Sequence, residues 1–112
     1  MRSSPVSPPK GAYPQSLDLP CTQRSERAAM LFKVLGDPTR LQILMIIAHN
    51  KDKAVCAVEL SEALNISAPT VTHHMKKLTD ANLVTRHKVG KWAYYEIVKS
   101  EYQRINKLVE AL

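Results

Sequence analysis

Residues 56–78 constrain the fold more than any other stretch, because two short helical patterns flank a turn there. The first pattern places apolar residues on one helical face: Cys56, Leu60, Ala63 and Leu64. The second pattern, after the turn at residues 65–67, does the same with Val71, Met75 and Leu78. Ser67 can cap this second helix, and Pro69 is tolerated in its first turn. Two helices joined this closely predict a helix-turn-helix.

The segments around this unit complete the predicted architecture. Residues 28–35 show a helical stripe that ends at Gly36, and the almost wholly apolar run 41–48 predicts a buried central helix after Asp37 and Pro38. β-prone runs at residues 83–88 and 92–98 flank Gly90, which suits a tight hairpin. Residues 102–112 return to a helical stripe. The expected fold is mainly α with a β-hairpin wing: a winged helix-turn-helix of five helices.

Length and composition bound the domain organisation. The 112 residues fit one domain, expected at residues 22–112. Five prolines among Ser and Gly in residues 1–20 predict a flexible N-terminal arm over residues 1–21. There is neither a signal peptide pattern nor an apolar run long enough for a membrane helix. Two cysteines are too few for a disulfide framework, so a reducing, cytoplasmic location is expected. No nucleophile with an evident base, carboxylate pair or phosphate loop points to an enzyme.

The distribution of charge points to nucleic acid. Sixteen Lys and Arg against ten Asp and Glu leave a net charge of +6, which favours a polyanionic partner. If the second helix buries its apolar stripe, polar side chains are left to meet base edges and phosphates: Ser67, Ala68, Thr70, His73, His74, Lys76 and Lys77. The hairpin adds Arg86, Lys88 and Lys91, within reach of a DNA backbone or minor groove.

Other uses of this surface stay open on the residues alone. Isolated charges are often only a solvated face, and a basic module can also bind RNA. RNA recognition relies on exposed aromatic side chains. Trp92, Tyr94 and Tyr95 alternate along one strand, so at least one of its faces is expected to be core. Duplex DNA is therefore the preferred partner.

Three motifs resemble the ArsR/SmtB family of metalloregulatory repressors. The run from Leu31 to Leu44, with Gly36-Asp37-Pro38 inside it, resembles the signature opening of that family. Residues 60–78 resemble its recognition unit, and residues 90–95 its wing, with Lys91 where Arg is more usual. The similarity covers roughly residues 26–112.

The resemblance implies a homodimer that binds an imperfect palindromic DNA operator and is released by a ligand. Such dimers are held by the first and last helices. The residues expected at the interface are Leu31, Tyr102, Ile105, Leu108, Val109 and Leu112. The apolar stripe of the last helix agrees with this, because a small monomer can cover it only in part.

The chain departs from the known metal sites of the family, and this limits the ligands that such a repressor could bind. Cys56 matches the first thiol of the family's Cys-Val-Cys core, but Val58 replaces the second. Lys99 and Glu101 stand where a zinc site on the last helix needs Asp and His. Cys56 and Cys21 remain as thiolate ligands for As(III), Cd(II) or Pb(II). A redox pair of these cysteines, an inert buried Cys56 and a regulator without a sensor are the alternatives.

Overall fold

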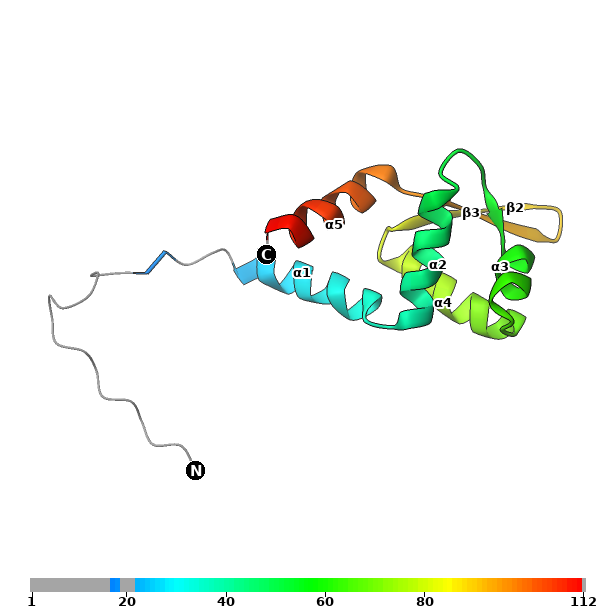
Figure 1. Cartoon of the computed structure of the whole chain (residues 1–112), viewed down its shortest axis with the longest axis horizontal. Helices are drawn as coiled ribbons and strands as arrows, with labels where there is room; N and C mark the ends of the chain where they lie inside the picture. Colours follow the sequence, from blue (N-terminus) through cyan, green and yellow to red (C-terminus); the bar gives the residue numbers. More distant parts are fainter. Residues whose placement is uncertain (1–16, 19–21, 112) are drawn as a thin grey trace, which may run out of the picture.

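The computed structural model describes residues 17–18 and 22–111. The expected arm, including Cys21, lies outside the described residues except for residues 17 and 18. Within residues 22–111 the chain forms five helices and three strands (Figure 1). In order these are α1 (Thr22–Leu35), α2 (Pro38–His49), β1 (Val55–Cys56), α3 (Ala57–Leu64), α4 (Ala68–Asp80), β2 (Val84–Val89), β3 (Trp92–Ile97) and α5 (Lys99–Ala111). The predicted winged helix-turn-helix is confirmed.

Local capping explains where the central helices begin. The carboxylate of Asp37 accepts a hydrogen bond from the backbone N–H of Arg40 at 3.0 Å, and Pro38 opens α2. This bond to the ionised form lowers the pKa of Asp37. At the start of α3, the carboxylate of Glu59 accepts from the backbone N–H of Cys56 at 2.9 Å. These short-range bonds fix where α2 and α3 begin.

The sheet contains one strand that the sequence pattern did not predict. β2 and β3 form the expected antiparallel hairpin, and Gly90 in its turn has a φ of 62°. The two-residue β1 pairs with the other side of β3, with Cys56 opposite Tyr94, which gives the order β1-β3-β2. The expectation that Cys56 lies on the helical stripe of Leu60 is therefore wrong. Cys56 is paired to the sheet and caps α3 instead.

The core forms where the helices meet the inner face of the hairpin. Its members are buried: Ile43, Leu44, Ile47, Val55, Leu60, Val71, Met75, Leu78, Leu83, Val84, Tyr95 and Ile105. The predicted stripe of α4 is confirmed. The helix α2 is buried on one face only, because Leu41 and Met45 are 39% and 57% exposed. This corrects the expectation of a helix surrounded by protein.

The helices α1 and α5 lie next to each other at the end of the molecule away from the hairpin tip (Figure 1). Ile105 of α5 is only 8% exposed and packs in the core of its own chain. It therefore has little surface left for a partner, against the expectation that it lies in an interface. Val109 is 55% exposed, and Leu31, Tyr102 and Leu108 are partly exposed. Leu112 lies outside the described residues.

Candidate nucleic-acid interface

The turn between α3 and α4 is held by hydrogen bonds on both sides. Asn65 takes the left-handed conformation, with a φ of 52°, at the end of α3. The hydroxyl of Ser61 donates to the carbonyl of Ile66 at 2.6 Å, and the backbone N–H of Ile66 donates to the carbonyl of Ser61 at 3.1 Å. Ser67 then accepts from the backbone N–H of Thr70 at 3.3 Å. The two helices are thus fixed relative to each other by the turn itself.

One face of α4 is free of contacts with the core. Its exposed side chains, with the preceding cap, include Ser67, Ala68, Thr70, Thr72, His73, Lys76 and Lys77. The hydroxyls of Ser67 and Thr70 lie 2.8 Å apart at the start of the helix. The ammonium of Lys76 forms an exposed ion pair with Asp80 at 3.0 Å, so the Asp80 carboxylate compensates part of the Lys76 charge. Hydroxyl side chains therefore lie at the N-terminal end of this face, and lysine side chains lie towards its C-terminal end.

His74 does not belong to this exposed face, contrary to the sequence prediction. Its side chain is 7% exposed, and within the described residues its Nδ1 has no hydrogen-bond partner. Val71, His74, Met75 and Leu78 follow the spacing i, i+3, i+4, i+7 of a buried helical face. This spacing was available in the sequence. The polar imidazole favours exposure, whereas its position on the stripe favours burial, and the packing against α2 decides for burial.

The N-terminus of α2 provides the charged groups around His74. Desolvation lowers the pKa of His74, while the Asp37 carboxylate opposes this shift, and Arg40 and the neighbouring His73 add to it. Arg40 is itself buried and donates to the carbonyl of Val34 at 2.8 Å. No local sequence pattern marks Arg40 as buried. Its place between the end of α1 and α4 follows only from the packing.

The buried His74 leads to a prediction about pH. Its pKa is lowered in the folded chain, so below about pH 6.5 the unfolded chain binds more protons. The free energy of unfolding is therefore expected to fall from about pH 7 to about pH 5. A His74→Leu variant should lose part of this dependence in urea denaturation followed by circular dichroism. The exposed His49→Gln variant, at the other end of α2, is the control, and equal pH dependence in H74L and wild type would contradict the prediction.

The hairpin presents the basic residues expected of a wing. Arg86, Lys88 and Lys91 are exposed. His87 lies 3.5 Å from the carboxylate of Glu96 and stacks on Tyr94, with the ring planes at 14°. Both α4 and β2 therefore present exposed cations, and the two elements contact each other.

The thiol of Cys56 lies apart from this surface. It is 8% exposed and makes no disulfide with any described residue. The part of the chain that the structure describes contains no group of three His, Cys, Asp or Glu side chains that could hold a metal ion. The other expected ligand, Cys21, lies outside the described residues. Among the described helices, none is long and apolar enough to cross a membrane.

Comparison with known proteins agrees with this geometry. The family model described as "Bacterial regulatory protein, arsR family" matches residues 37–86, from the cap of α2 into β2. An uncharacterised helix-turn-helix transcriptional regulator of Methanocaldococcus jannaschii is 40% identical over 90 residues, covering 80% of this chain and 99% of that protein. An arsenical resistance operon repressor of Staphylococcus xylosus is 37% identical over 82 residues, covering 73% of this chain and 76% of that repressor.

A solved structure shares the architecture as well. Reduced HlyU from Vibrio cholerae superposes with a TM-score of 0.66 at 26% identity, covering 80% of this chain and 90% of that one. The relatives are DNA-binding transcriptional regulators, which agrees with the expectation that the chain is not an enzyme. The chain belongs to the arsR family of bacterial regulatory proteins, and it is a DNA-binding transcriptional repressor with a winged helix-turn-helix fold.

Proposed function

We propose that this repressor binds an imperfect palindromic operator in duplex DNA as a homodimer in the cytoplasm, and that a thiophilic metalloid or metal releases it. The observation that carries the proposal is the exposed face of α4, which the turn at Asn65 holds clear of the core beside a basic hairpin. A helix of this diameter fits the major groove. The proposed DNA contacts are Ser67, Ala68, Thr70, His73, Lys76 and Lys77 on α4, with Arg86, Lys88 and Lys91 on the hairpin.

The order of side chains along α4 supports separate roles in base recognition and in phosphate binding. The hydroxyl of Thr70 and the imidazole of His73 can each donate to or accept from a base edge. Lys77, Arg86 and Lys88 are exposed cations suited to phosphates, which carry affinity but little sequence information. We therefore assign base reading to the first two turns of α4 and positioning to the cations.

A second copy of the chain is the proposed partner of α1 and α5. Met30, Phe32 and Val109 leave 71%, 37% and 55% of their surface exposed at this end of the molecule. The proposed interface comprises Leu31, Tyr102, Leu108, Val109 and Leu112, without Ile105. A two-fold axis there would place two α4 helices about 34 Å apart, one turn of DNA. Sedimentation equilibrium tests the proposal, and a monomer at the concentration that binds DNA would contradict it.

Cys56 is the proposed ligand for As(III), Cd(II) or Pb(II), with Cys21 as the second thiol. The Staphylococcus xylosus relative that represses an arsenical resistance operon supports this choice. The described residues offer only one thiol, so a second thiol and a further donor are needed. Cys56 joins β1 to α3, and α3 packs on α4. A ligand that draws Cys56 outward would therefore disturb the helix that supports the recognition helix.

Fluorescence anisotropy tests the proposed DNA binding. A labelled duplex from the region upstream of the protein's own gene is titrated at fixed salt, and an unrelated duplex of equal length is the control. Preference for the first duplex supports the proposal, and equal affinity for both contradicts it. Salt concentration is held constant because the phosphate contribution depends on it.

The effect of Cys56→Ser on release tests the proposed sensor. Arsenite or cadmium is expected to release the wild-type protein from the duplex, while C56S keeps its affinity for DNA and no longer responds. Cys21→Ser is the matched variant and should weaken the response in the same way. Release of wild type by an oxidant alone, with no effect of either ion, would replace the metalloid by a redox signal.

A further inference from the structure

The tip of the hairpin carries two exposed apolar side chains that no part of the chain covers within the described residues. Val89 is 62% exposed and Trp92 is 45% exposed. They are directly opposite each other in the register of β2 and β3, so their side chains share one face of the hairpin. The hairpin projects past α3 at the far end of the molecule from α1 and α5 (Figure 1). The pair forms an apolar tip on an otherwise basic wing.

Two exposed cations lie on the opposite face of the same hairpin, beyond its buried part. Arg86 and Lys88 alternate with His87 and Val89 along β2, so they point to the other side. Lys91 lies over the indole of Trp92, 5.2 Å from the ring centroid, which places a cation beside the apolar pair. The carboxylate of Glu96 lies 3.5 Å from the imidazole of His87, further from the tip, on the face that carries Val89 and Trp92. The tip therefore combines an apolar pair with nearby cations, which suits a polyanion that also offers an apolar surface.

We infer that Val89 and Trp92 form an apolar wedge that enters a DNA minor groove beside the site read by α4, and packs against deoxyribose. The walls of the minor groove combine sugar carbons with phosphates, which match the apolar and the basic side chains of the wing. Proteins that enter this groove often use such wedges together with Arg or Lys. This inference rests on the proposed DNA binding. It adds a residue-level contact that contributes affinity by burial rather than by charge.

Trp92 is the single tryptophan of the chain, so its fluorescence reports on the wing alone. On titration with the upstream duplex, acrylamide quenching of Trp92 is expected to decrease as the anisotropy of the labelled DNA rises. If the DNA binds specifically but the quenching of Trp92 is unchanged, the inference fails while the proposed function stands. If the protein binds both duplexes with equal affinity, the proposed function is contradicted, and the inference that rests on it is contradicted as well. Shielding that occurs without DNA and is lost on dilution would assign the tip to a protein interface and overturn the inference.

Substitutions can distinguish an apolar contact of the wing with DNA from an electrostatic one. Trp92→Ser and Val89→Ser should each weaken binding, by about tenfold for W92S, because apolar burial is lost. Their slope of log affinity against log salt should equal that of wild type, whereas Lys88→Ala should reduce the slope by about 0.9. Met45→Ser, on the exposed face of α2, is the control for loss of an exposed apolar side chain. A reduced slope in W92S, or wild-type affinity in both wing variants, would overturn the inference.

The groove itself can be altered without changing the protein. Inosine in place of guanine removes the amino group from the minor groove and leaves the acceptors of the major groove intact. Placed beside the half-site, inosine should change the affinity of wild type and have a smaller effect on W92S. An equal response of the two proteins would show that the wedge does not reach the minor groove.

Discussion

Replacement of Leu78 by alanine is expected to lower the free energy of unfolding by about 3–5 kcal/mol. Leu78 is 0% exposed and lies on the buried face of α4, in the cluster that joins the helices to the hairpin. The loss combines the transfer free energy of the missing atoms with the cavity that they leave. Because a domain is stable by only about 5–15 kcal/mol, this one change should remove a large part of the total.

Urea denaturation followed by circular dichroism measures this loss, with protein concentration held equal because dimerisation would add to the apparent stability. Met45→Ala is the matched control, since Met45 is apolar but 57% exposed, and it should change stability by less than about 0.5 kcal/mol. Equal effects of the two substitutions would mean that α4 is not anchored through Leu78.

The double substitution Thr70→Ala and His73→Ala is expected to reduce affinity for the preferred duplex by about a hundredfold. Both side chains are exposed on the first two turns of α4, where a base-reading helix meets the groove. Each lost base contact costs about 1–3 kcal/mol. Affinity for an unrelated duplex should stay near that of wild type, because the cations that bind phosphates are retained.

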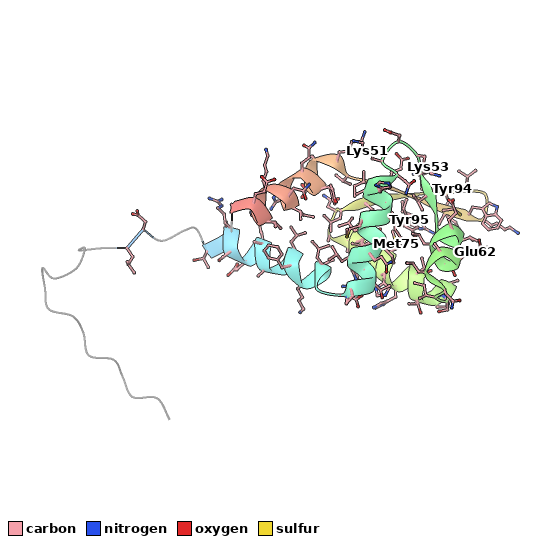
Figure 2. The ribbon with its side chains drawn as sticks, in the orientation of Figure 1. Lys51, Lys53, Glu62, Met75, Tyr94 and Tyr95 are labelled. Carbon is pink, nitrogen blue, oxygen red and sulfur yellow. The ribbon has the colours of Figure 1, made fainter. Side chains whose placement is uncertain are left out.

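The control for this experiment removes charge from another part of the molecule. Lys51 and Lys53 lie in the connection after α2, away from α4 (Figure 2). Lys51→Ala with Lys53→Ala should leave the preference between the two duplexes unchanged. If T70A/H73A lost affinity for both duplexes equally, the first turns of α4 would supply general affinity rather than base recognition.

Local sequence signals were sufficient for the elements that carry the proposed DNA contacts. The helical spacing of Val71, Met75 and Leu78 determined the inward face of α4, and Ser67 and Asp37 marked where two helices begin. Gly90, with its positive φ, marked the hairpin. These signals work because capping bonds and turn conformations involve residues only a few positions apart.

Tertiary packing alone decided which side chains are available. The sequence labels His74 as polar, yet its position on the α4 stripe buries it against the N-terminus of α2. Cys56 leaves its expected helix because it pairs with Tyr94, which lies 38 positions further along the chain. Strand pairing and the charged groups that surround a buried side chain come from partners that are distant in sequence, so neither can be obtained from a local pattern. The recognition helix was therefore determined by its own residues, and the surface that it presents was determined by its neighbours.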